Sequence, residues 1–187
     1  MEDVVNAVLM ELPPNRIVTS ISVDGQPIPR QQTSPALKEN LQKVKEVHIR
    51  TADAAIWAGN GLDRAISDIE RLQKSLLLAA EFFRDETKTA DGNKIFLRCV
   101  EGLERFLDTI VLTRLAMKLD FQKIQVDGIT LARLEKDLTA ILGGIVGFQE
   151  KQDYEGVADK VEYELLPNFS SWTRALNQLR VSLQSNA

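Results

Sequence analysis

The chain is short of the residues from which most metal and redox sites are built. Its 187 residues include one histidine, His48, and one cysteine, Cys99. A lone cysteine cannot form a disulfide bond within the chain, and such usage is typical of a reducing cytoplasm. A lone histidine cannot supply the paired Glu-x-x-His motifs of di-iron bundles, and no second histidine or cysteine lies near it to share a metal ion. We therefore expect no metal and no cofactor.

Nucleophilic and phosphate chemistry also lack their usual residues. Gly143, Gly144 and Gly147 are not followed by the Lys-Ser/Thr pair that a phosphate-binding loop requires. No Gly-x-Ser-x-Gly motif is present. Cys99 falls on an apolar helical stripe, where a thiol behaves as a small hydrophobe. We therefore predict that the chain is not an enzyme and has no catalytic residues.

Basic excess and long apolar runs are missing as well. The net charge is -4, whereas binding to nucleic-acid backbones needs clustered Lys and Arg. No apolar run is long enough to span a bilayer, and the first residues lack the basic start of a signal peptide. We expect no nucleic-acid partner, no membrane partner and a cytoplasmic location.

What the chain does have is a local concentration of acid. Residues 150–164 hold six acidic residues and two lysines, a balance of -4 that equals the net charge of the whole chain. At 100° per residue, Glu155, Asp159 and Glu162 fall on one side of a helix. The other side carries the apolar stripe of an amphipathic helix, which consists of Tyr154, Val157, Ala158, Val161, Leu165, Trp172, Leu176, Leu179 and Leu183.

Two large side chains, Tyr163 and Leu166, also point outward from this helix. The plainer interpretation of the acids is a solvated face. The sharper one is a docking face for a basic protein partner with Tyr163 as its anchor, because aromatic side chains carry much of the energy at interface centres. The predicted partner-binding residues are Glu155, Asp159, Glu162, Tyr163 and Leu166. Pro167 predicts a kink or break just before it.

Residues 1–50 predict a small α+β unit with a sheet of about three strands. Alternating apolar residues indicate strands, and the dipeptide Asp24-Gly25 indicates a tight hairpin turn. The predicted elements are helices at 2–12 and 34–42 and strands at 16–23, 26–29 and 44–50.

Residues 51–187 change to helical periodicity and predict four amphipathic helices joined by short links. We therefore expect a mainly α fold, an up-down four-helix bundle that carries the small N-terminal unit. Thr51 or Asp53 caps the first helix and Asp153 caps the fourth. The predicted connections are loops at 87–93 and 120–128; in the second, Val126-Asp127-Gly128 repeats Val23-Asp24-Gly25, which we interpret as coincidence.

Some apolar residues lie off the main stripes of the first two long helices. A helix that is apolar on two sides is covered on both or presents a patch to a partner. We expect a homodimer with contacts at Leu78, Phe82, Leu112, Leu115 and Leu119. The three glycines of the third helix indicate close approach of another backbone.

Arg114 falls on the inward stripe of the second long helix. The plainer interpretation is that its stem packs while its charged head reaches the solvent. The alternative is a contact to an anionic ligand, in a small-molecule sensor or enzyme with its site between the α+β unit and the bundle.

A set of residues in the fourth helix resembles the signature of an uncharacterised bacterial family: Asp153, Tyr154, Ala158, Asp159, Glu162–Pro167 and Trp172. Members are similar in having a strand-rich start with a Val-Asp-Gly turn and a helical body, so the resemblance covers most of the chain. It implies no particular activity. The helical half is also similar in size and style to small bacterial export chaperones such as the flagellin chaperone FliS, from which no binding residue carries over. The predicted function is a non-catalytic interaction module, an adaptor or chaperone-like protein.

Overall fold

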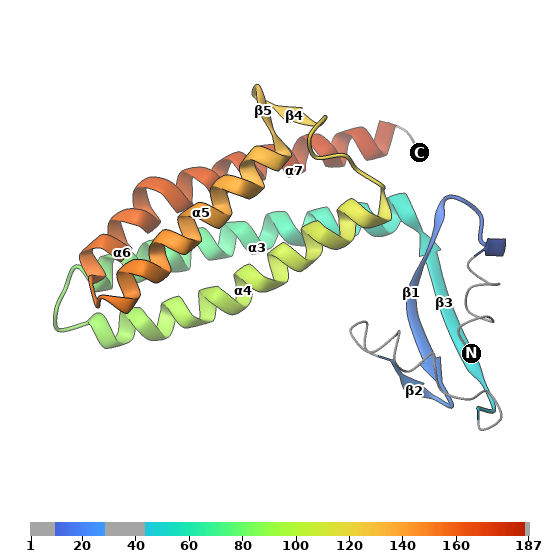
Figure 1. Cartoon of the computed structure of the whole chain (residues 1–187), viewed down its shortest axis with the longest axis horizontal. Coiled ribbons are helices and arrows are strands. Elements are labelled where there is room, and N and C mark those ends of the chain that lie inside the picture. The colour runs from blue at the N-terminus through green and yellow to red at the C-terminus, as the bar shows by residue number, and fades with distance from the viewer. Residues whose placement is uncertain (1–9, 29–43, 186–187) are drawn as a thin grey trace. The chain divides into compact units, whose positions relative to one another are not determined.

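The structure is a computed structural model that describes residues 10–28 and 44–185. The chain packs as two compact units that divide between Trp57 and Ala58. The strands of the first unit and the helices of the second are shown in Figure 1.

The first unit contains an antiparallel three-stranded sheet in the order β2-β1-β3. Its strands are β1 (Arg16–Val23), β2 (Gln26–Pro27) and β3 (Val47–Asp53). Asp24 and Gly25 join β1 to β2 with φ angles of 49° and 79°, the left-handed pair that a two-residue hairpin of the type I′ class needs. Ile21 is buried at the centre of this sheet's small apolar cluster.

The strand predictions for this unit are confirmed in kind and corrected at their ends. The third strand begins at Val47 rather than at residue 44 and runs on to Asp53. Its pairing continues to the first residue of β1, Arg16, which lies opposite Asp53. The predicted helix at 34–42 lies outside the described residues. Of the predicted helix at 2–12, residues 10–12 are described: Met10 and Glu11 are helical and Leu12 is not.

The second unit confirms the predicted mainly α, four-helix up-down bundle. Three helices are single elements: α3 (Ala54–Phe83), α4 (Thr89–Ala116) and α5 (Leu131–Glu150). The fourth runs through α6 (Tyr154–Lys160), the π turn η3 (Val161–Leu165) and α7 (Leu166–Ser185).

The centre of the bundle is an aromatic cluster. Phe106 of α4 and Phe169 and Trp172 of α7 are at most 1% exposed. The ring centroid of Phe106 lies 6.1 Å from that of Phe169 and 5.8 Å from that of Trp172, both edge to face. Such pairs favour each other beyond the area they bury, so this cluster ties α4 to the fourth helix.

The predicted helix caps at Asp53 and Asp153 are confirmed. The Asp53 carboxylate accepts hydrogen bonds from the backbone N–H groups of Ala55 and Ile56. Asp153 accepts one from the N–H of Gly156, with 2.9 Å between nitrogen and oxygen. These aspartates satisfy donors that the first turn of a helix leaves unpaired.

The predicted loop at 87–93 is wrong, because α4 begins at Thr89. Asp85 holds a shorter turn by accepting hydrogen bonds from the N–H and hydroxyl of Thr87. Hydrogen bonds from Lys88 and Thr87 lower the pKa of the Asp85 carboxyl to about 2. Gly92, which the sequence analysis placed in the loop, is a buried residue of α4, and a Cβ there would lie 3.0 Å from a ring carbon of Phe83.

The fourth helix does not break before Pro167 but forms a π turn. The N–H of Leu166 donates to the carbonyl of Val161, five residues back. Proline has no N–H to donate, and a π turn is one way for a helix to absorb that loss. The wider turn also rotates the residues after it, so Phe169, which the predicted stripe omits, is fully buried.

The tripeptide Val126-Asp127-Gly128 makes the same turn as Val23-Asp24-Gly25. Asp127 and Gly128 have φ angles of 51° and 78°. They join two short strands, β4 (Gln125–Val126) and β5 (Ile129–Thr130), just before α5. Thr130 then caps α5 through its side chain. The repeated tripeptide therefore reflects one local solution used at two places.

The prediction that another backbone closely approaches the three glycines of α5 is wrong. A Cβ added at Gly143 or Gly147 would meet nothing within 4 Å. A Cβ at Gly144 would lie 2.6 Å from the Cε atom of Lys160, which is a side-chain contact. No helix in the described part of the chain combines the length and the low charge needed to cross a membrane.

Replacing Gly143 with Ala should raise the free energy of unfolding by about 0.5–1 kcal/mol, because Gly is that much worse than Ala inside a helix. Urea denaturation measures the change. Gly144→Ala is the matched control, since its Cβ would displace the Lys160 side chain that pairs with Glu164 and should bring a smaller gain. Equal gains from both substitutions would contradict this account of the glycines.

Candidate functional site

The predicted partner-binding residues lie along the outer side of the fourth helix. Glu155 and Asp159 are exposed on α6, and Glu162 is half-buried in the π turn. Tyr163 is 68% exposed. Leu166 is partly buried against the core of the bundle, so it presents only part of its side chain outward.

Arg84, the residue after the end of α3, binds two of these acids at once. Its Nη2 atom lies 2.7 Å from Oδ1 of Asp159, and its Nη1 atom lies 2.8 Å from Oε2 of Glu162. Burial works to lower the pKa of Arg84, but hydrogen bonds and charge from Asp159 and Glu162 outweigh it and raise that pKa. Nothing in the spacing of the fourth helix indicates this partner, because it comes from another helix.

Other charges on this helix are satisfied locally or remain free. Lys160 pairs with Glu164 one turn on, with 2.7 Å between nitrogen and oxygen. Among the described residues, Glu155 makes no ion pair. The acidic surface is therefore partly neutralised within the fold, with Glu155 as its free charge.

Leu77 of α3 adds an apolar residue that the sequence did not single out. The amide of Gln73 donates to the hydroxyl of Ser170 at 3.2 Å, and Arg84 reaches Asp159, so α3 runs antiparallel to the fourth helix. Residues four and seven apart share a helix side. Leu77 thus lies between Gln73 and Arg84, beside the fourth helix, and it is 41% exposed.

We call this surface the docking face, and it consists of Leu77, Glu155, Asp159, Glu162, Tyr163 and Leu166. Two apolar residues and a tyrosine lie among three acids, and Arg84 holds two of these, Asp159 and Glu162, in place. The arrangement can bind a side chain or a peptide.

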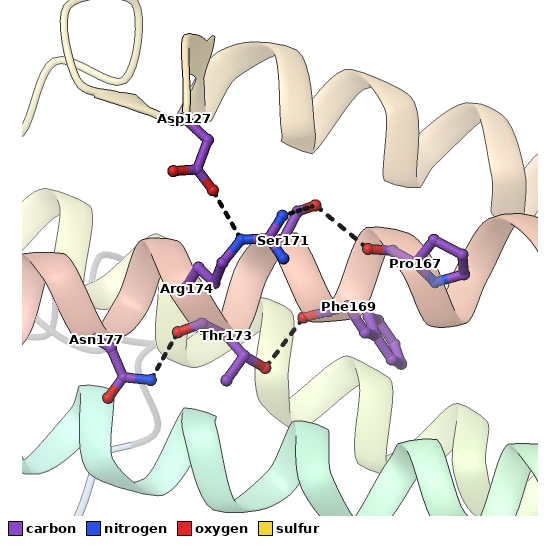
Figure 2. Close-up of polar contacts among 7 residues, drawn as sticks. All are labelled: Asp127, Pro167, Phe169, Ser171, Thr173, Arg174 and Asn177. Atoms are coloured by element: carbon purple, nitrogen blue, oxygen red, sulfur yellow. Dashed lines mark hydrogen bonds and ion pairs between the residues drawn. The ribbon is translucent and has the colours of Figure 1, made fainter.

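Beyond the docking face, the polar side chains of α7 are used inside the fold (Figure 2). Arg174 donates to Asp127 at 2.8 Å and to the Ser171 hydroxyl at 3.2 Å, which ties the β4–β5 turn to α7. The Ser171 hydroxyl donates in turn to the carbonyl of Pro167. These contacts mark the end of the docking face toward the C-terminus.

Arg114 has its own partners within the bundle. Its guanidinium lies 4.9 Å from the centroid of the Phe121 ring and 3.6 Å from a carboxylate oxygen of Glu135. The side chain is 44% exposed. An arginine that stacks on an aromatic ring and reaches the solvent is fully accounted for by packing and pairing.

The predicted dimer contacts fall into two separate clusters. Leu112, Leu115 and Leu119 lie at the C-terminal end of α4 and just beyond it, and Leu115 is 67% exposed. Leu78 is 41% exposed, and Phe82 lies beside Gly92 at the start of α4. Twenty residues separate Gly92 from Leu112 along α4, which is roughly 30 Å.

The two residues scarcest in the chain take no part in the docking face. Cys99 is buried in the bundle, and burial raises the pKa of its thiol to about 11. His48 lies on β3 of the first unit, 3.0 Å from the Glu46 carboxylate. Within residues 10–28 and 44–185, no three His, Cys, Asp or Glu side chains gather into a metal-binding cluster.

Comparison with known proteins identifies a family but no characterised relative. The model of a family described as a domain of unknown function (DUF8042) matches residues 61–175. The match covers more than half of the chain and includes the whole docking face. No curated protein matches, and no solved structure matches. The chain therefore belongs to this family of domains of unknown function.

Replacing Arg84 with Ala should lower the free energy of unfolding by about 0.5–1 kcal/mol in low salt, and by less in 1 M salt, because partly exposed ion pairs are weak and screened. Urea denaturation at the two salt concentrations measures both values. Arg98→Ala is the control, because Arg98 is exposed and makes no ion pair among the described residues. An equal loss in both variants, or a loss that salt leaves unchanged, would argue against the ion pairs.

Proposed function

We propose that this member of the family is a non-catalytic protein-interaction module, an adaptor or chaperone-like protein, which binds a basic segment of a partner protein at the docking face. The observation that carries the proposal is the exposure of Tyr163, at 68%, on the outer side of a helix whose inner side forms the bundle core. An aromatic residue held outward is a poor contributor to folding and a good one to binding.

The apolar part of the docking face gives Tyr163 neighbours against which a partner can pack. Leu77 is 41% exposed, and Leu166 is partly buried against the core. Energetically important interface residues cluster near the centre of a contact and are surrounded by residues that exclude water. Leu77 and Leu166 suit that surrounding role.

The charged part favours a basic partner. Residues 150–164 carry six acids against two lysines, and Arg84 offsets part of this charge through Asp159 and Glu162. An incoming lysine or arginine would find Glu155 without an ion pair. The carboxylates of Asp159 and Glu162 would already be held in position by Arg84. Fixed groups lose less freedom on binding, which improves affinity, and the remaining charge would speed the encounter.

A small-molecule sensor or enzyme that uses Arg114 draws no comparable support. Its guanidinium is already stacked on Phe121 and paired with Glu135. An anionic ligand would have to displace the Glu135 carboxylate from the guanidinium. For this reason we favour the interaction module over the sensor or enzyme as the function of the second unit.

We also propose that the chain forms a homodimer through Leu78, Phe82, Leu112, Leu115 and Leu119. In a two-fold dimer the same surface meets itself, so residue i contacts residue j and the reverse. With the two clusters roughly 30 Å apart along α4, an antiparallel pairing of α4 helices would bring each cluster of one copy to the other cluster of its partner.

Replacing Tyr163 with Ala should weaken the partner by about 2 kcal/mol, roughly 30-fold in Kd, as the loss of an interface anchor does. The partner is captured from the source cells on the immobilised chain, purified, and titrated by calorimetry. The free energy of unfolding should change by less than about 0.5 kcal/mol, because the side chain is exposed.

Leu97→Ala is the matched control for Tyr163→Ala, because Leu97 is 66% exposed on α4, away from the docking face. Neutralising Glu155, Asp159 and Glu162 together should weaken binding and reduce its salt dependence. Equal weakening by the Leu97 variant, or binding that survives both docking-face variants, would exclude this face as the site.

Light scattering at high micromolar concentration should give the mass of a dimer, and Leu115→Glu should reduce it to that of a monomer, because a buried unpaired charge opposes association. Val146→Glu is the control and should leave the dimer intact, because Val146 is 53% exposed on α5 and is not one of the proposed contacts. A monomer mass for the unaltered chain, or equal effects of the two substitutions, would rule out the proposed contacts.

A further inference from the structure

The second unit contains an apolar cavity between α4 and α5 with a volume of about 190 Å³. Its floor is the core of the bundle, and it draws one or more residues from each of the four helices. Leu76, Phe96, Ile145, Leu165 and Phe169 line the floor, and each is at most 7% exposed. The cavity thus reaches from the surface of the bundle into its core.

The opening of the cavity lies between half-buried residues of the two helices. Val100 and Leu103 of α4 face Leu142 and Gln149 of α5 across it. Gln149 is the only residue of the lining with a polar amide, and no charged residue lines the cavity. Cys99 also lines it, and its buried thiol, with a pKa raised to about 11, is uncharged at neutral pH.

Charged residues line a different hollow, on the other side of Leu72 and Cys99. A separate groove of about 310 Å³ runs between α3 and α4 and is lined by Arg71, Arg98 and Arg105. Leu72 and Cys99 line both hollows, so these two side chains separate the arginines from the apolar cavity. A ligand in the cavity therefore meets hydrocarbon on its sides and one amide at the opening.

The physics of such a space favours one kind of occupant. Protein interiors are close-packed, and a gap in them loses the attraction of the atoms that would fill it. Water gains little there, because it needs two or more polar partners. An apolar cavity of roughly 150 Å³ is known to stay dry and to bind benzene, so this cavity has room for a ring with a small substituent.

We propose that the cavity is a binding site for a neutral, ring-sized aromatic molecule of the size of toluene or indole, with Gln149 meeting a single polar atom at the opening. The site is independent of the docking face, which lies on the outer side of the fourth helix. Its ligand class follows from the volume and from the absence of charge in the lining.

The test measures the melting temperature of the full chain with toluene, indole or benzoate, each at several concentrations. Toluene or indole near saturation should raise the melting temperature by about 3 °C, because a ligand that binds only the folded state stabilises it. Benzoate should have no effect, since its charge would lose its hydration against hydrocarbon. Cys99 gives a second reading: the bound ring should slow its reaction with a small thiol reagent at least several-fold.

Val100→Phe places a ring at the opening and should abolish both effects. Val111→Phe is the matched control, because Val111 is 48% exposed on the same helix and does not line the cavity. Leu142→Phe closes the opening from α5 and serves if the Val100 variant does not fold. The proposal is overturned if neither neutral ligand shifts the melting temperature or protects Cys99. It is equally overturned if the shift survives in the closed variants, or if benzoate binds as well as toluene, which would point to the arginine groove.

Discussion

The fourth helix depends on one missing hydrogen-bond donor, the backbone N–H that Pro167 does not have. The helix adapts through the π turn at Val161–Leu165 rather than by breaking. The wider turn lets the apolar residues of the helix face the core and the remaining residues face the solvent. Phe169 and Trp172 enter the aromatic cluster with Phe106, while Tyr163 stays outside, at 68% exposure. The same π turn thus places Phe169 and Trp172 in the core of the bundle and leaves Tyr163 outward in the docking face.

Features that depend on neighbouring residues were predictable from the sequence. The caps at Asp53 and Asp153 and the hairpin turn at Asp24-Gly25 each follow from a few consecutive residues, and all three are present. Amphipathic periodicity likewise predicted the helices and the buried side of the fourth one. Local chemistry was enough in these cases because the interactions span at most a few residues.

Features that join distant parts of the chain were not predictable in this way. Arg84 meets Asp159 across 75 positions, and no spacing rule within either helix indicates the pair. From the sequence alone Gly92 indicates a loop, and only the structure shows that the Phe83 ring lies against it. The cavity beside Cys99 is a property of four packed helices, and its lining residues were predicted only as ordinary core. The acids and Tyr163 could be named from the sequence, whereas Leu77 and Arg84 needed the packing.

The two hollows that flank α4 also bear on how the bundle moves. On one side lies the arginine-lined groove and on the other the apolar cavity, with Leu72 and Cys99 shared between them. A helix with fewer packed atoms on two sides loses less when it separates from its neighbours, so its local opening takes less free energy than that of a fully packed helix. The amide hydrogens of α4 near Cys99 are therefore the ones we expect to exchange with solvent through partial opening, before the molecule unfolds as a whole. The entry of any molecule into the bundle would follow the same movement.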